Sequence, residues 1–251
     1  MSLLSLNHLK KKYSMEITNL AHIGAHKGQE VQDYLDLFPN AQIYLFEPQK
    51  KLFQYLQDNF EKFENISIYN FALGNTNSFS KMYISDNDGQ SSSFYKPKFH
   101  LEEHPEISFK KLEEIYSIKV LDELGIKEID FLNIDTQGYE MNVLLGAVNL
   151  LSSNVKYIIL EINKKELYEG CPLVKDIDRF LKKYDFVRTD THFWMDSYSW
   201  GDAFYIKKYL ISKKRYIFSK FKNKLFSIEY FFSSLIVIRN IFWKIRSKLN
   251  K

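Results

Sequence analysis

Cysteine is almost missing from this sequence, since Cys171 is the single one among 251 residues. One thiol cannot form an internal disulfide, and it cannot supply a metal site built from several cysteines. A long apolar run is also missing near the N-terminus, because residues 8–19 read HLKKKYSMEITN, which is too polar for a signal peptide. We therefore expect a protein of a reducing, cytoplasmic compartment.

Acidic residues are scarce in the C-terminal part of the chain. Residues 207–251 hold 13 lysines and arginines but one acid, Glu229, whereas the rest of the chain holds 22 basic and 30 acidic residues. The overall net charge of +4 therefore comes from this basic tail. The remainder is mildly acidic, which is not typical of a nucleic-acid-binding protein, so we expect no nucleic-acid partner.

Two glycine-rich fingerprints are absent from the most informative stretch of the chain. Neither the dinucleotide pattern G-x-G-x-x-G nor the phosphate loop G-x-x-x-x-G-K-[ST] occurs there. Residues 20–47 instead read LAHIGAHKGQEVQDYLDLFPNAQIYLFE. The apolar spacing predicts a strand at 20–23, a turn at 24–28, a helix at 30–38 and a strand at 41–46 that ends in Glu47.

This stretch predicts a nucleoside-binding site at the carboxyl end of a parallel sheet, where ligands bind in open α/β folds. Exposed amide groups at the helix start would hold a polar ligand group. Gly24 and Gly28 allow positive φ and a close approach of the ligand, and Glu47 would accept hydrogen bonds from two ribose hydroxyls. A turn with so few glycines suits a ligand that lacks a pyrophosphate, such as S-adenosylmethionine. The alternative is an ordinary tight turn between a strand and a helix.

Acids also close two later strands of the predicted sheet. The apolar run at 129–134 leads into Asp135, and the run YIILEI at 157–162 carries Glu161 near its end. Together with Glu47, these acids would meet at one rim of the sheet. Because unpaired buried carboxylates are costly, three acids at one rim predict a binding or catalytic site. The alternative is that they are solvated acids of loops.

The segment at 75–111 is polar and aromatic and lacks helical periodicity. An excursion this long inside an α/β domain is usually functional or disordered. His100 and His104 lie four residues apart, a spacing that on a helix would suit a metal site, but Pro105 argues that any helix ends at His104. We expect a solvated loop that helps to shape an acceptor pocket, and no bound metal.

Four motifs in order carry a family resemblance: HIGAHKGQE, YLFEP, FALGN and LDELGIKEIDFLNIDTQGYEMNVLLGA. Over about residues 18–206 the chain resembles the FkbM family of S-adenosylmethionine-dependent methyltransferases. The most specific part is the D-x-Q-G-x-E block beside V-L-x-G-A. The chain departs from the common pattern at His22, where many members have an acid, at His26, where many have asparagine, and at Asn133, where many have lysine.

The resemblance implies a Rossmann-like class I methyltransferase fold, in the α/β class. A mostly parallel sheet would be flanked by helices and closed by an antiparallel hairpin at 185–206. It also implies methyl transfer from S-adenosylmethionine, mostly to hydroxyl oxygens of sugars and other natural products. In such a site we assign Gly24, His26 and Gly28 to the methionine end of the cofactor, and Phe71 and Ala72 to the adenine.

Asp135 is our leading candidate to touch the methyl-donor end of the cofactor or to accept the proton of the acceptor hydroxyl. His26 and Glu161 are the alternative bases. Gln90 and Ser92 resemble the family's G-x-S-S segment, which would close over the cofactor or the acceptor. His192 lies near the turn of the expected hairpin beside tryptophans, which would either stack on a sugar ring or cap the core.

We divide the chain into a lead at 1–17, a methyltransferase domain at 18–208 and a basic helical tail at 209–251. Residues 225–243 are apolar but interrupted by charges, and fall short of the roughly 20 residues that a membrane span needs. Basic clusters flank this run, which suits a helix lying on an anionic membrane surface. Packing of the tail on the body or on a second subunit is the alternative.

Two other interpretations of the whole chain stay open. One is a catalytically inactive nucleoside-binding or membrane-docked scaffold. The other is a different nucleotide-dependent enzyme, such as an oxidoreductase, which the missing third glycine disfavours.

Overall fold

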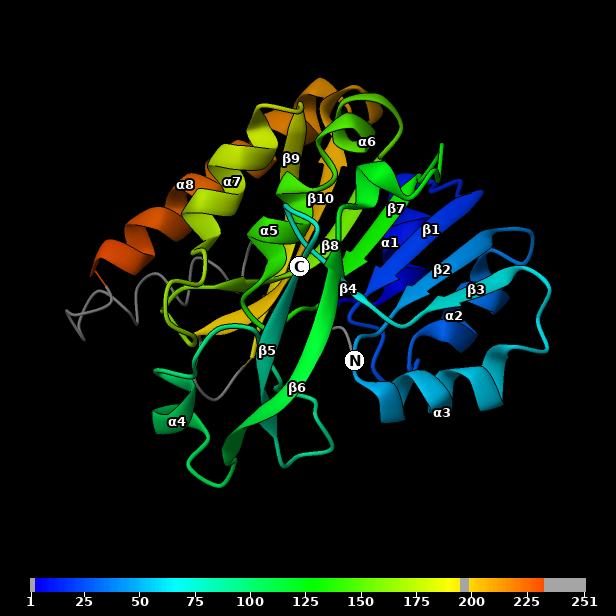
Figure 1. The fold of residues 1–251 in the computed structure, drawn as a ribbon. Helices are drawn as coiled ribbons and strands as arrows, with labels where there is room; N and C mark the ends of the chain where they lie inside the picture. The colour runs from blue at the N-terminus through cyan, green and yellow to red at the C-terminus, as the bar shows by residue number, and fades with distance from the viewer. Residues whose placement is uncertain (1–2, 195–198, 233–251) are drawn as a thin grey trace.

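The structure is a computed structural model that describes residues 3–194 and 199–232. Its main sheet has the strands β1 (Asn19–Ile23), β2 (Gln42–Phe46), β3 (Ile66–Tyr69), β7 (Phe131–Ile134), β8 (Tyr157–Asn163), β9 (Phe186–Phe193) and β10 (Trp200–Lys207). They lie in the order β3-β2-β1-β7-β8-β10-β9 (Figure 1). Neighbours from β3 to β8 pair in parallel, whereas β10 is antiparallel to β8 and to β9. The predicted sheet and its closing hairpin are confirmed.

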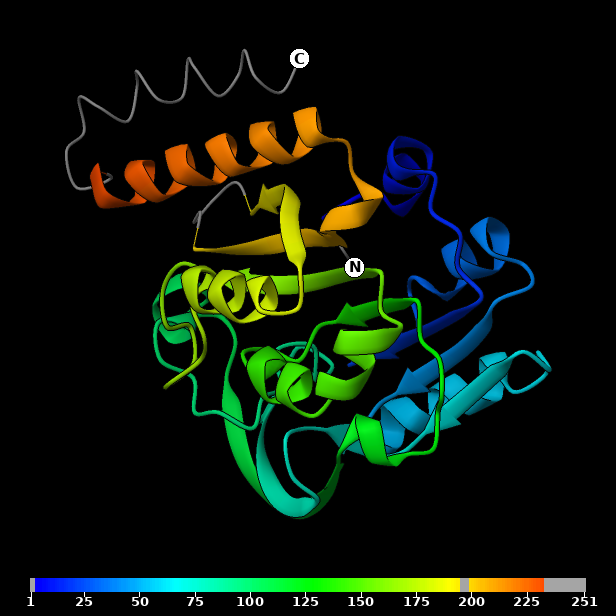
Figure 2. The ribbon, with the colours of Figure 1, turned by 90° about the horizontal axis from the view of Figure 1, so that it is seen from above.

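Helices cover both faces of this sheet, as Figure 2 shows. One face carries α1 (Leu6–Tyr13), α2 (Val31–Leu37) and α3 (Lys50–Phe60), and the other carries α5 (Glu140–Leu145), α6 (Val148–Ser153) and α7 (Val174–Lys182). Strand β1 shows why two cores form, because successive side chains of a strand point to opposite faces. Leu20 is buried in the first core, and Ala21 and Ile23 are buried in the second.

A second, smaller sheet is the part of the fold that we did not predict. It consists of β4 (Ala72–Leu73), β5 (Ser78–Ser85) and β6 (Phe109–Lys119), in the order β4-β6-β5, with the one-turn helix α4 (His100–Glu103) between the two long strands. The polar segment at 75–111 therefore contains β5 and the first residues of β6, joined by a connection that holds α4. Strand β3 ends at Tyr69, and the chain then crosses into the second sheet.

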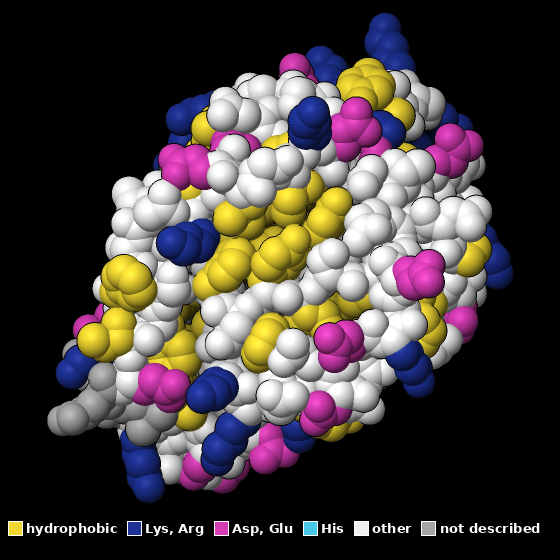
Figure 3. All heavy atoms as spheres, turned by 45° about the vertical axis from the view of Figure 1, so that its right-hand side comes forward, with side chains coloured by type: hydrophobic (Ala, Val, Ile, Leu, Met, Phe, Trp, Pro, Cys, Tyr) yellow, Lys and Arg dark blue, Asp and Glu magenta, His cyan; other side chains and the backbone are white. Residues whose placement is uncertain are grey.

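Helices α5 and α6 follow one another directly, and a close backbone approach accounts for the break between them. A Cβ atom on Gly146 would lie 2.0 Å from the carbonyl oxygen of Gly74, so this junction requires glycine. The short helical turn η1 (Leu121–Glu123) precedes β7. On the face of the molecule shown in Figure 3, apolar side chains gather in a hollow surrounded by polar and charged groups.

The two ends of the described chain are helical. Helix α1 buries Leu6 and Leu9 in the first core, so the lead packs on the body. After β10 the chain forms η2 (Lys208–Leu210) and the long helix α8 (Lys213–Phe232), which contacts β9. Within the described residues, no helix has the length and apolar character that would let it cross a membrane. The greater part of the apolar run at 225–243 lies outside the described residues.

Candidate functional site

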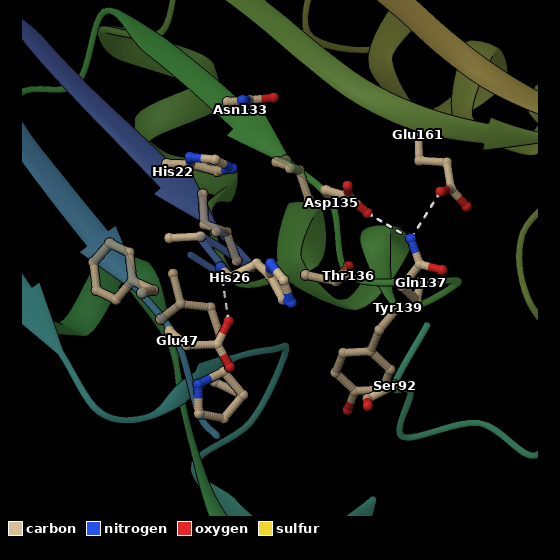
Figure 4. A pocket seen from close by; sticks show the side chains of 18 of the residues that line it. His22, His26, Glu47, Ser92, Asn133, Asp135, Thr136, Gln137, Tyr139 and Glu161 are labelled. Atoms are coloured by element: carbon tan, nitrogen blue, oxygen red, sulfur yellow. Dashed lines mark hydrogen bonds between the residues drawn. The ribbon is translucent and has the colours of Figure 1, made fainter. Parts of the chain in front are cut away.

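A cavity opens at the carboxyl ends of β1, β2 and β7, next to the point where the strand order reverses (Figure 4). About 920 Å³ of space lies between its lining atoms, including the part open to solvent. Met82 of β5 and Gln90, Ser92 and Phe94 of the following loop form part of its wall. The second sheet therefore shapes the cavity, and Gln90 and Ser92 are among the residues that line it.

Internal hydrogen bonds hold the glycine turn after β1. The N–H groups of Gly24 and Ala25 both donate to the carbonyl of Phe46, at 3.0 and 3.1 Å, and the N–H of Gly28 donates to the carbonyl of Ala25 at 2.7 Å. These three amides already have acceptors inside the protein. The expectation that exposed amides of this turn hold a polar ligand group is therefore corrected for these positions.

The two glycines of this turn are required for different reasons. Gly24 lines the cavity with φ +81°, and a Cβ there would lie 1.8 Å from the carbonyl oxygen of Asp135. A Cβ on Gly28, with φ +69°, would instead lie 2.6 Å from Cε2 of Phe60 on α3. The structure thus places Gly28 at a packing contact outside the cavity lining. This position corrects the assignment of Gly28 to the methionine end of the cofactor.

His26 occupies the centre of the turn with φ +48°, and its ring lines the cavity. Nε2 of its ring lies 3.1 Å from the carbonyl oxygen of Asp88, and Nδ1 lies 2.9 Å from Nε2 of Gln29. Beside it, Nζ of Lys27 lies 2.8 Å from Oδ2 of Asp88. These contacts connect the turn to the loop that follows β5, so His26 and Lys27 join two walls of the cavity.

Glu47 follows β2 directly, and its side chain is only 3% exposed. Its Oε2 accepts the N–H of His26 at 2.9 Å, and its Oε1 accepts the N–H of Gln49 at 2.8 Å. Burial raises the pKa of this carboxyl to about 7, although the two backbone donors oppose that shift. Glu47 lines the cavity, and the free lone pairs of its carboxylate remain to accept hydrogen bonds from a ligand.

An amide side chain connects the other two predicted acids. Nε2 of Gln137 donates to Oδ1 of Asp135 at 2.7 Å and to Oε2 of Glu161 at 2.9 Å (Figure 4). Gln137 has φ +52°, and its Oε1 accepts the hydroxyl of Tyr168 at 3.0 Å, which fixes the orientation of the amide. Asp135 and Glu161 thus meet at one rim as predicted, and Gln137, which we did not predict as a site residue, connects them.

Glu161 and Glu140 are buried carboxyls in the same rim. Burial, followed by the nearby charges of Asp135 and Glu140, raises the pKa of Glu161 well above its usual value, so its neutral form is favoured. Burial also raises the pKa of Glu140 to about 7. Oε1 of Glu140 accepts the N–H groups of Thr136 and Gly138 at 3.1 and 3.0 Å, so this acid supports the turn that carries Gln137.

A buried polar group that the sequence analysis did not predict lies behind the cavity. Nδ2 of Asn133 donates to the hydroxyl oxygen of Tyr34 at 2.6 Å, and that oxygen lies 3.3 Å from Nδ1 of His22. Burial lowers the pKa of His22, which keeps its imidazole neutral. The two departures from the family pattern, His22 and Asn133, therefore meet at one hydroxyl and line the cavity together.

Two other predicted contacts lie elsewhere. Ala72 lines the cavity, but the ring of Phe71 packs 5.7 Å from Phe46 and 5.5 Å from Tyr69, centroid to centroid. His192 pairs with Asp202 in the hairpin and lines a separate groove between α1, β9 and α8. Sequence spacing could place His192 near the hairpin turn, but not on the correct side of the sheet.

The charge of the lining distinguishes between cofactor classes. Five carboxylic acids, and neither lysine nor arginine, are found among the described residues that line the cavity: Glu30, Glu47, Asp135, Glu161 and Asp202. A dinucleotide carries a pyrophosphate that this lining would repel. A nucleoside with a ribose diol, an ammonium group and a sulfonium supplies donors and positive charge, which these acids accept. The residues present therefore fit S-adenosylmethionine.

The methyltransferase FkbM domain model matches residues 22–188 of the chain. The chain belongs to the FkbM methyltransferase family. Methyltransferases of this family take the methyl group from S-adenosylmethionine, so the cofactor predicted from the sequence is confirmed. The match includes both the glycine turn and the Asp135–Glu161 rim.

One curated protein and one solved structure are similar to this chain. A curated 2-O-methyltransferase, NoeI of Sinorhizobium fredii, is 27% identical over 174 residues, which cover 66% of this chain and 71% of that protein. A crystal structure of methyltransferase FkbM from Methylobacillus flagellatus superimposes with a TM-score of 0.51 at 12% identity. That match covers 75% of this chain but 43% of the other one, and it supports the FkbM fold alone.

Proposed function

We propose that this FkbM protein transfers a methyl group to a hydroxyl oxygen of a sugar or glycan-type acceptor. Support comes from the family and from the oxygen specificity in the name of the relative NoeI. The cavity supports the same chemistry, because its rim provides carboxylates for the proton that a hydroxyl must lose. S-adenosylmethionine, when bound, supplies the electrophilic methyl group on its sulfonium.

The observation that carries this proposal is the pair of carboxyls, Asp135 and Glu161, joined by the Gln137 amide. Two acids this close do not both ionise easily, so one of them keeps a proton. Because Glu161 is the more deeply buried and has a pKa raised well above its usual value, we assign the proton to Glu161 and the charge to Asp135. Asp135 is then the general base, and it accepts the acceptor's proton as the oxygen–methyl bond forms.

The other residues of the site have binding roles in this proposal. Glu47, at the opposite wall, accepts the ribose hydroxyls, and the backbone at Ala72 contacts the adenine. Gln90 and Ser92 contact the acceptor from the loop of the second sheet. His26 is less suited to act as the base, because both of its ring nitrogens are engaged by Asp88 and Gln29.

Asp135→Asn tests this assignment, because it keeps the shape of the side chain and removes the base. General-base catalysis contributes about 10²- to 10⁴-fold to rate, so turnover should fall by that factor while the affinity for S-adenosylhomocysteine changes little. The assay measures S-adenosylhomocysteine formation with a panel of mono- and oligosaccharides, and calorimetry measures binding. A fully active variant would exclude Asp135 as the base. Tight cofactor binding by the wild type without turnover on any hydroxyl acceptor would contradict the proposed function.

A further inference from the structure

Helix α8 uses one side to pack on the body of the protein. Ser219 is buried, and Nδ2 of Asn223 donates to the carbonyl of Arg188 on β9 at 2.9 Å. Near the start of the helix, Nη1 of Arg215 donates to the carbonyl of Lys12 at 2.8 Å. These contacts fix which side of α8 faces the protein, and therefore which side faces outward.

The outward side of α8 combines large apolar side chains with lysines. Ile217 and Phe221 are 58% and 55% exposed, although side chains of this kind are normally buried. Ile217 and Phe221 are one helical turn apart and form an apolar stripe. Four exposed lysines of the same helix surround this stripe: Lys213, Lys214, Lys220 and Lys224.

We propose that this outward side of α8, called the α8 face below, docks the protein on an anionic membrane surface. The sequence has no acid from residue 212 to residue 228, so the lysines meet no opposing charge along this part of the helix. Apolar side chains enter the interface between lipid head groups and acyl chains, while lysine stems cover apolar surface and place their charges at the head groups. Polybasic segments of this kind are attracted to negatively charged lipid surfaces.

The same geometry argues against other modes of attachment. Within the described residues no helix is suited to span a membrane, and the packing of α8 on β9 keeps its axis along the surface of the protein. A protein partner would need a complementary acidic and apolar groove, whereas an anionic bilayer supplies both properties without a specific fit. This inference does not depend on the proposed methyl acceptor, and its test is independent of turnover.

The test is co-sedimentation of the full chain with vesicles of phosphatidylcholine alone and of phosphatidylcholine mixed with phosphatidylglycerol. Binding should require the anionic lipid and weaken with salt. Each lysine near such a surface contributes about fivefold to partitioning, so replacing Lys213, Lys214 and Lys220 by glutamine should weaken binding about 100-fold. Changing Ile217 and Phe221 to serine should weaken it at least about tenfold.

A matched control removes the same charge from another part of the surface. Lys51, Lys62 and Lys127 are exposed and lie outside α8, and their replacement by glutamine should leave lipid binding within about twofold of the wild type. All variants should keep S-adenosylhomocysteine affinity, which shows that they are folded.

Three results would overturn the proposal. The first is equal binding to neutral and anionic vesicles, or no binding at all. The second is undiminished binding by both α8 variants, which would assign attachment to another segment, such as the basic residues 233–251. The third is a wild-type dimer that the serine variant converts to a monomer without any lipid binding, which would make the α8 face a protein interface.

Discussion

Glu47 should make cofactor binding depend on pH. Its burial raises its pKa to about 7, and a ligand whose hydroxyls donate to this carboxylate binds the ionised form. At that pKa roughly one tenth of the molecules are ionised at pH 6 and roughly nine tenths at pH 8. Since the apparent Kd scales with the inverse of the competent fraction, it should be about tenfold weaker at pH 6 than at pH 8.

Glu47→Gln removes this titration and also weakens the site. The two carboxylate oxygens accept the N–H groups of His26 and Gln49 at 2.9 and 2.8 Å, so the new amide must turn its NH₂ group toward one of these donors. Hydrogen bonds to a charged group are worth about 1.5–3 kcal/mol. At pH 8 the variant should therefore bind the cofactor about 10- to 150-fold more weakly than the wild type. Its Kd should no longer depend on the ionisation of residue 47.

The assay is titration calorimetry with S-adenosylhomocysteine at pH 6, 7 and 8. Protonation of the ligand itself is common to both proteins and cancels in the ratio of their Kd values. Glu140→Gln is the matched control, because this buried carboxyl also has a pKa raised to about 7, yet it does not line the cavity. The control should keep the tenfold pH dependence. Equal pH profiles for the wild type and Glu47→Gln would refute the assignment of Glu47 to the cofactor.

Two further predictions concern stability, measured by denaturant unfolding. Because the pKa of Glu140 is raised in the folded state, the stability that this carboxyl contributes is lost as pH rises from about 4.5 to 7. The free energy of unfolding of Glu140→Gln should therefore exceed that of the wild type by about 1–3 kcal/mol above pH 7, and should differ little from it below pH 4.5. Its Oε2 has no partner among the described groups, so the new amide loses no bond; an unchanged pH profile would contradict this. Gly28→Ala should cost about 1–3 kcal/mol, because the new Cβ would lie 2.6 Å from Phe60 at φ +69°. A variant as stable as the wild type would show that this turn relaxes freely.

Periodic segments of the chain were predictable, because each one shows its buried face in the sequence. Strand β1, helix α2 and strand β2 lie within a residue or two of the expected ranges, and the acids after β2 and β7 line one cavity. Strand order identifies an edge of the sheet, and an acid that follows a parallel strand must lie at that edge. The identity of the cofactor was predicted from the family motifs.

The second sheet was not predictable from periodicity. Strand β5 reads SFSKMYIS, in which Phe79 is 72% exposed and Met82 is buried, so polar and apolar residues do not separate between its two faces as they do in a one-sided strand. The position of Phe71, which we had assigned to the adenine, was not predictable for a related reason. One residue decides whether a side chain points into the cavity or into an aromatic cluster, and at this position the chain passes between two sheets.

The Gln137 amide holds two acids together at the rim without adding a charge. A lysine at this position would place a positive charge between the two carboxyls and oppose the rise in the pKa of Glu161. The neutral amide donates hydrogen bonds to both carboxyls but adds no charge, so burial and the nearby Asp135 still raise the pKa of Glu161. Tyr168 orients the amide by donating to its oxygen, which presents the NH₂ group to the acids. Under the proposed assignment, the two side chains hold Asp135 in position, and neither lysine nor arginine among the described lining residues competes for its carboxylate.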